Sequence, residues 1–171
     1  MAENGLIVSG GTVIAEYIEE TEPASTTDLL WGEAPMRAEI RRLVQWFEFK
    51  FNREVGGPLV SERVIKRFSG SGDISSSVIR LALNNLKIHM DYIDWLSEHS
   101  NWLAGKRLSL ADLAAAAHLS VLDFLGDIDW GRHPEAKIWY AKMKSRPSFR
   151  DLLGDQVVGL VPPPHYSDMD F

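Results

Sequence analysis

The chain contains 171 residues, and its 18 Lys and Arg against 24 Asp and Glu give a formal net charge of −6 at pH 7. That length suits one domain with a small appendage, and the lack of cysteine excludes disulfides, thiolate metal ligands and a cysteine nucleophile. No apolar run approaches the length of a membrane span, no secretory signal pattern opens the chain, and the acidic balance argues against general nucleic-acid binding. We therefore expect a cytoplasmic protein.

The N-terminal segment combines a short strand pattern with a helix pattern. Residues 5–9 (GLIVS) predict one strand, and residues 12–20 predict a helix that Thr12 caps. A lone strand has no partner for its hydrogen-bond ladder. We therefore expect residues 1–22 to be the end of a sheet-containing unit whose remainder is missing, followed by a polar linker over residues 23–34.

Every later segment predicts helix, so the fold class is mainly all-α. Pro35 suits the first turn of a helix that runs to about Val55, where the Gly-Gly-Pro sequence at 56–58 is expected to end it. Further helices are expected at residues 59–68, 76–99, 109–125, 134–145 and 148–153. Two apolar stripes on the 76–99 helix favour the middle of a bundle, and residues 35–154 form the predicted helical domain.

Ser109 and Asp112 form a capping-box pattern at the start of an alanine-rich helix. A hydroxyl beside a carboxylate also admits a catalytic interpretation. The need to satisfy backbone amides at the helix end explains their spacing fully, so we assign both residues a structural role. The helix that they open is apolar almost all round, which is typical of the buried axis of an α domain.

The last residues, 155–171, predict a tail that is rich in proline, acidic and aromatic side chains. Three consecutive prolines favour the extended polyproline II conformation. The tail either packs back onto its own domain or forms a recognition patch for a protein partner. The candidate partner-binding residues are Tyr166, Asp168, Met169, Asp170 and Phe171.

Two segments resemble the glutathione S-transferase family. Residues 6–18 (LIVSGGTVIAEYI) resemble the last strand and helix of that family's thioredoxin-like domain. Residues 102–112 (WLAGKRLSLAD) resemble the entry into the central helix of its C-terminal domain. The resemblance implies a C-terminal-type helical bundle preceded by a β-strand and helix remnant of the thioredoxin-like domain.

A subgroup of this family is also similar to the C-terminal part. Residues 134–150 (PEAKIWYAKMKSRPSFR) and 165–171 (HYSDMDF) are similar to alphaproteobacterial glutathione-transferase-like division factors that bind the tubulin-like protein FtsZ. That similarity implies a homodimeric scaffold in cell division, with FtsZ or another division protein as partner. It favours partner recognition as the role of the tail.

The family resemblance implies a place for glutathione at Gly11 and Thr12. This pair matches a turn where the family carries an acidic or amide residue followed by Ser or Thr. The Thr12 hydroxyl and the neighbouring helix amides can hold a carboxylate, whereas Gly11 lacks the side chain of the family pattern. The alternative is that Thr12 merely caps its helix, which we favour. The residue that stabilises the glutathione thiolate in this family is expected to lie before Met1, so no cofactor is expected to be required.

Trp46 and Phe49 are candidates for a ligand pocket, because the equivalent helix lines the electrophile pocket in enzymes of this family. Aromatic side chains at helical spacing are more often core or dimer surface, which is the interpretation that we favour. No metal site is expected, since no two of the five histidines are four residues apart.

Two functions therefore remain. The first is a non-catalytic interaction scaffold, which the tail and the glycine at position 11 support. The second is a glutathione-dependent transferase or isomerase, which family membership alone supports.

Overall fold

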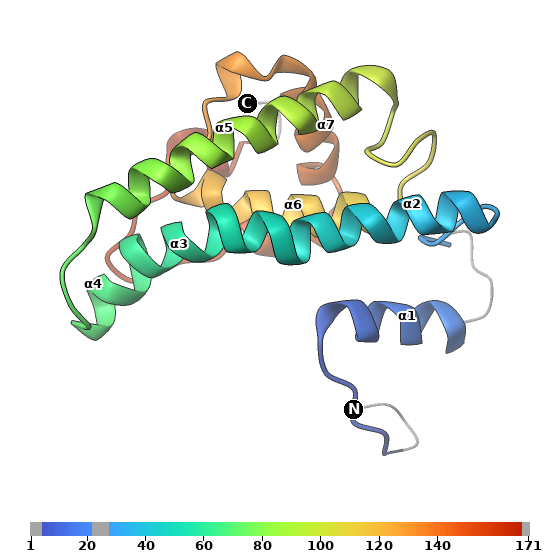
Figure 1. Ribbon diagram of the computed structural model, residues 1–171, viewed down its shortest axis with the longest axis horizontal. Helices are drawn as coiled ribbons and strands as arrows, with labels where there is room; N and C mark the ends of the chain where they lie inside the picture. The colour runs from blue at the N-terminus through green and yellow to red at the C-terminus, as the bar shows by residue number, and fades with distance from the viewer. Residues whose placement is uncertain (1–4, 22–27, 169–171) are drawn as a thin grey trace.

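The structure, a computed structural model, describes residues 5–21 and 28–168, and every regular element in them is helical (Figure 1). The elements are α1 (Gly11–Thr21), α2 (Ala34–Gln45), η1 (Trp46–Gly56), α3 (Gly57–Val60), η2 (Ser61–Ile65), α4 (Lys66–Ser69), α5 (Ser76–His99), α6 (Leu110–Phe124), η3 (Trp130–Arg132), α7 (Pro134–Lys144), α8 (Pro147–Leu153) and η4 (Pro164–Tyr166). The predicted all-α class is confirmed for these residues.

Helix α6 is the central helix of the bundle. Its fully buried side chains include Ala111, Ala115, Ala116, Leu119 and Leu122. The small alanines let neighbouring helices approach closely, and α6 packs against α2, η1 and α7. Helix α5 packs against η1, α3 and α7, and Figure 1 shows it alongside the run that contains α2 and α3. The helix that Ser109 and Asp112 open is therefore buried, as its composition predicts.

The segment from α2 to α4 is one continuous helical run, so the predicted end at residues 56–58 is wrong. Segments η1 and η2 are π-helical, and the amide of Gly57 donates to the carbonyl of Asn52, five residues earlier. The proline lacks an N–H for the carbonyl of Glu54, four residues before it. The side chain of Asn85 on α5 donates to that carbonyl at 3.2 Å. A wider turn and a donor from another helix thus accommodate the proline.

The N-terminal segment also differs from its prediction. Residues 5–9 are irregular, and the described residues contain no strand to pair with them, so no ladder forms. Helix α1 begins at Gly11, and the amide of Ile14 donates to the carbonyl of Gly10 at 2.9 Å. Thr12 therefore lies inside the first turn and is not the N-cap.

Two polar contacts hold α1 in place. Arg41 on α2 makes a bidentate ion pair with Glu16, with distances of 2.6 and 2.8 Å. The amide of Leu29 donates to Glu19 at 3.1 Å. None of the residues of α1 is buried, and Ile14 and Ile18 are exposed. The apolar stripe of α1 is thus uncovered in the described part of the protein.

The remaining helices agree with the sequence pattern. The predicted helix over residues 76–99 is confirmed as α5, and the hydroxyl of Ser75 caps it by accepting from the amide of Val78. Helices α7 and α8 match the predicted 134–145 and 148–153 helices to within one residue. Among the described residues, no helix has the length and apolarity needed to span a bilayer.

Candidate functional site

A cavity of about 390 Å³ lies between α1, the α2–η1 run and α6. Gly11 and Thr12 both line it, so the turn that the family resemblance assigns to glutathione faces an open space. The other walls are mostly apolar, and they include Leu30, Val44, Leu110, Leu113, Ala114 and Ala117. The arrangement suits an apolar molecule with a small polar group near Thr12.

Of the described residues, three charged side chains line the cavity and set its electrostatics. The ion pair with Arg41 holds the pKa of Glu16 below its usual range, so these two charges neutralise each other. Glu48 on η1 points toward the start of α1, and its Oε1 lies 3.6 Å from where a Cβ of Gly11 would stand. The negative charge of Glu48 repels the carboxylate of any ligand that binds at the amino end of α1. The cavity is therefore a poor site for an anion.

Trp46 and Phe49 do not line this cavity. They border a separate, shallower hollow of about 530 Å³ on the outer face of α2 and η1, together with Arg42, Gln45, Lys50 and Arg53. Phe49 is 67% exposed, whereas Trp46 is half-buried. The structure thus places the two predicted pocket residues on the surface of the bundle.

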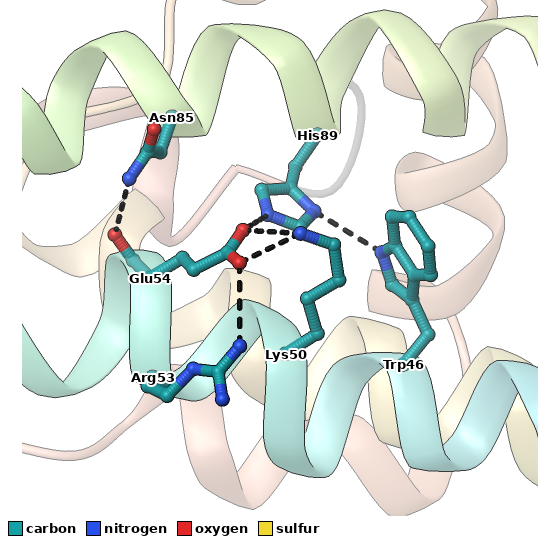
Figure 2. A network of polar contacts seen from close by, with 6 residues as sticks. All are labelled: Trp46, Lys50, Arg53, Glu54, Asn85 and His89. Atoms are coloured by element: carbon teal, nitrogen blue, oxygen red, sulfur yellow. Dashed lines mark hydrogen bonds and ion pairs between the residues drawn. The ribbon is translucent and has the colours of Figure 1, made fainter.

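Beneath this surface a polar network joins η1 to α5, and Figure 2 shows its members around His89. Trp46 Nε1 donates to His89 Nδ1 at 3.1 Å, and His89 Nε2 lies 3.1 Å from Glu54 Oε2. Since an indole nitrogen can only donate, Nδ1 must be the accepting nitrogen, and the proton of the neutral ring sits on Nε2. Lys50 reaches both oxygens of Glu54, at 2.6 and 2.7 Å.

The network fixes the protonation of its members. Burial lowers the pKa of the His89 imidazole, although Glu54 acts in the opposite direction. The hydrogen bond from Lys50 lowers the pKa of Glu54. His89 is therefore a neutral, doubly hydrogen-bonded side chain whose geometry holds the Trp46 ring at the surface.

The outer face of α5 carries an exposed apolar stripe, defined here as Leu81, Ile88 and Trp95. These side chains are 63%, 68% and 53% exposed, and their seven-residue spacing places them on one side of the helix. The stripe and the uncovered face of α1 are two apolar surfaces that the described residues leave open.

The C-terminal tail packs on its own domain up to Tyr166. Lys144 Nζ donates to the carbonyl of His165 at 2.8 Å, and His165 Nε2 lies 2.9 Å from Asp123 Oδ1. Tyr166 is 3% exposed, donates to the carbonyl of Leu152 at 3.1 Å and packs edge-on against Phe124. We call Asp123, Lys144, His165 and Tyr166 the tail lock.

The tail lock corrects one residue of the predicted recognition patch, Tyr166. Tyr166 is buried because its ring completes the core beside Phe124, so it is not available as an exposed anchor. Burial raises the pKa of its hydroxyl to about 12. Asp168 is exposed. The other three candidate residues, Met169, Asp170 and Phe171, lie outside the described residues.

Ser109 and Asp112 are fully buried at the start of α6. Asp112 Oδ2 accepts from the amide and the hydroxyl of Ser109, both at 2.9 Å. Its Oδ1 accepts from the amide of Leu103 at 2.8 Å and from Trp139 Nε1 at 2.9 Å. The carboxylate thus ties the start of α6 to the preceding loop and to α7, which is a structural task.

Sequence reasoning missed Glu48, His89 and the partners of the tail, although packing of the tail on its own domain was one of its two alternatives. Only the Lys50–Glu54 pair carried a local signal, because a four-residue spacing places two side chains together on a helix. His89 and Glu54 are 35 residues apart, and His165 and Asp123 are 42 apart. Nothing in one sequence indicates such pairs.

The helical fold, the cavity at the amino end of α1 and the buried capping box define a class of protein. A family model for the glutathione S-transferase C-terminal domain matches residues 81–147, and the chain belongs to the glutathione S-transferase family. FtsZ-localized protein A of Caulobacter vibrioides is 46% identical over 169 residues, which cover 99% of this chain and 73% of that protein.

Solved structures agree with this assignment. A glutathione S-transferase from Rhodospirillum rubrum is 50% identical, with a TM-score of 0.93 over 99% of this chain and 75% of that one. FzlA from C. crescentus is 48% identical, with a TM-score of 0.88 over 94% of this chain and 70% of that one. The family and subgroup resemblances of the sequence are confirmed.

Proposed function

We propose that this protein is an interaction scaffold of bacterial cell division that associates with FtsZ in the cytoplasm and needs no glutathione. The main support for this proposal is the 46% identity to FtsZ-localized protein A along almost the whole chain. The cavity supports the non-catalytic part of the proposal, since Gly11 lacks a side chain and Glu48 opposes an anionic ligand there.

The tail is the proposed contact with FtsZ. The tail lock anchors His165 and Tyr166, so Ser167 and Asp168 follow directly from a fixed point. Asp168 and Asp170 then supply negative charge, and Met169 and Phe171 supply apolar anchors. Anchoring the start of a contact segment lowers the conformational entropy that binding costs, and His165 and Tyr166 supply that anchor here.

The test is a titration of the fluorescently labelled protein with purified FtsZ, followed by anisotropy. We expect Asp168→Lys to weaken the affinity by about threefold or more, because it reverses a charge at the proposed contact. The matched control is Asp151→Lys on α8, which changes the net charge equally at another exposed acidic residue. Equal weakening by both variants contradicts a tail contact, and the absence of binding by the wild type contradicts the proposal itself.

The protein is further proposed to act as a homodimer. Its two uncovered apolar surfaces, on α1 and on the α5 stripe, support this, since isologous pairing is the commonest way to bury such faces.

The second candidate function is a glutathione-dependent transferase. The cavity beside Thr12 favours it, because its volume and apolar walls suit an electrophile. Purified protein with glutathione and a general electrophile is expected to give the background rate. Turnover above background that Thr12→Ala abolishes supports the transferase instead.

A further inference from the structure

A third hollow, of about 510 Å³, shares the side chain of Leu113 with the cavity beside α1 but has a different set of charged residues. It forms where the segment before α2, the loop between α5 and α6, and the start of α8 meet. Among the described residues, three cationic side chains line it, namely Lys106, Arg107 and Arg146, against one carboxylate, Asp28. In a chain with a net charge of −6 this is a local excess of positive charge. We call it the basic hollow.

The walls of the basic hollow are fixed by hydrogen bonds. The amide of Leu110 donates to the carbonyl of Leu29, and Trp31 Nε1 donates to the carbonyl of Leu108, both at 3.0 Å. Trp102 and Gly105 exchange two backbone hydrogen bonds, at 2.9 and 3.0 Å. The loop that carries two of the three cations is therefore pre-organised for a ligand.

The loop packs tightly against Trp31 at Gly105. Its φ of +142° lies in the region that favours glycine, and a Cβ there would stand 3.4 Å from the ring of Trp31. The guanidinium of Arg107 lies over the same ring, 5.5 Å from its centroid. The turn, the tryptophan and the arginine thus form one packed unit at the edge of the hollow.

The three cations are not neutralised by the part of the chain that the structure describes. Arg41 and Arg42 each hold a carboxylate with two nitrogens, whereas no carboxylate of residues 5–21 or 28–168 lies within ion-pair distance of these three. Asp28 accepts from the amide of Leu30. Within the same residues the buried Nε of Arg146 has no acceptor. An unused guanidinium donor of Arg146 therefore remains beside the hollow in the described part of the chain.

We propose that the basic hollow binds a small molecule that carries a diphosphate group. Guanidinium groups offer paired donors that match phosphate oxygens, and an ammonium adds a compact charge. Three cations around one hollow match the two or more negative charges of a diphosphate better than those of a single phosphate. The hydroxyl of Ser148 and the indole of Trp102 complete the lining with a donor and an apolar face.

The experiment is calorimetric titration of the purified protein with pyrophosphate and, separately, with inorganic phosphate at matched ionic strength. We expect saturable binding of one pyrophosphate per chain, tighter than that of phosphate. Arg107→Gln and Arg146→Gln are each expected to weaken pyrophosphate binding about two- to fivefold, as for an exposed ion pair. Arg150→Gln is the matched control, because this exposed arginine lies on α8 but does not line the hollow. Circular dichroism checks that each variant is folded.

The source of the diphosphate is distinguished by a third titration with ADP. Binding equal to or tighter than that of pyrophosphate, and weakened by the same variants, assigns the hollow to a nucleoside diphosphate. Weaker binding of ADP assigns it to a diphosphate without a base. Absence of saturable pyrophosphate binding, or equal weakening by the Arg150 control, overturns the proposal. So does an acidic peptide that displaces pyrophosphate at lower concentration, because the hollow then belongs to a protein partner.

Discussion

Both ring nitrogens of His89 have a partner in the folded protein, and this makes the side chain sensitive to protonation. A second proton on the ring must go to Nδ1, which faces the N–H of Trp46 at 3.1 Å. Two donors would then oppose each other. Glu54 and Lys50 lie on the other side of the ring, and Phe51 packs edge-on against it at 5.1 Å. Burial and geometry thus both favour the neutral ring.

The predicted consequence is a loss of stability on acidification that depends on His89. Its folded-state pKa lies below the ordinary value of 6.5, so the unfolded chain takes up the proton at higher pH than the folded protein does. Stability from this side chain is present above pH 6.5 and is lost as the pH falls through the folded-state pKa.

Urea unfolding of the wild type and of His89→Gln at about pH 7.5 and about pH 5.5 checks this prediction. The free energy of unfolding of the wild type should exceed that of the variant by a larger margin at the higher pH. Parallel pH profiles for the two proteins contradict it.

At the scale of residues, contacts between neighbours in the sequence could be predicted, and contacts between distant residues could not. Ser109 and Asp112 could be predicted because both lie within one helical turn. The bonds that Asp112 accepts from Leu103 and Trp139 could not, since folding alone brings these groups together. The family resemblance predicted that Gly11 and Thr12 face a binding site, and both line the cavity. Nothing in the sequence predicted that Glu48 lies opposite them.

At the scale of elements, the run from α2 to α4 depends on help from α5. Pro58 cannot donate to the carbonyl of Glu54, and Asn85 donates in its place at 3.2 Å. Asn85→Ala is therefore expected to lower the free energy of unfolding by about 1 kcal/mol, as for one lost hydrogen bond. Asn84→Ala, at an exposed neighbour on the same helix, is the matched control and should cost less in denaturant unfolding. Equal losses contradict the role given to Asn85.

A helix could be predicted where its own residues supply both its cap and its apolar periodicity. The helix over residues 76–99 has its own cap and its own periodicity, and α5 reproduces it. The strand predicted at residues 5–9 is wrong, because a strand needs a neighbouring strand and the described residues contain none. An apolar run by itself was not sufficient evidence for a strand. The helix end predicted at 56–58 was wrong for a related reason. The hydrogen-bond donor to the carbonyl of Glu54, which Pro58 cannot supply, comes from Asn85 on another helix.

At the scale of the whole molecule, the two apolar faces that residues 5–21 and 28–168 leave uncovered predict self-association. Ile88 is central to the α5 stripe and 68% exposed, so Ile88→Glu should leave the fold intact while it places a charge in the proposed contact. Light scattering is expected to give a dimer for the wild type and a monomer for the variant at the same concentration. A wild-type monomer at all concentrations contradicts the dimer.

The tail lock makes the C-terminal segment part of the folded domain. Tyr166→Ala removes a buried ring and its hydrogen bond to Leu152, and it should lower the free energy of unfolding by about 3 kcal/mol. Asp168→Lys, at an exposed position two residues further on, loses only a charge attraction to Lys144 and no buried ring, so it should change it less. Thermal or urea unfolding of the two variants checks the contrast. Equal stability of Tyr166→Ala and wild type would show that the tail lock does not form.

The central claim is that this glutathione S-transferase family member works by binding FtsZ and not by glutathione chemistry. Co-sedimentation with FtsZ polymers, assembled with GTP and without glutathione, tests it most directly. We expect the protein to pellet with the polymers in a saturable manner and to remain in the supernatant when FtsZ is omitted. A protein that stays in the supernatant at every FtsZ concentration contradicts the claim.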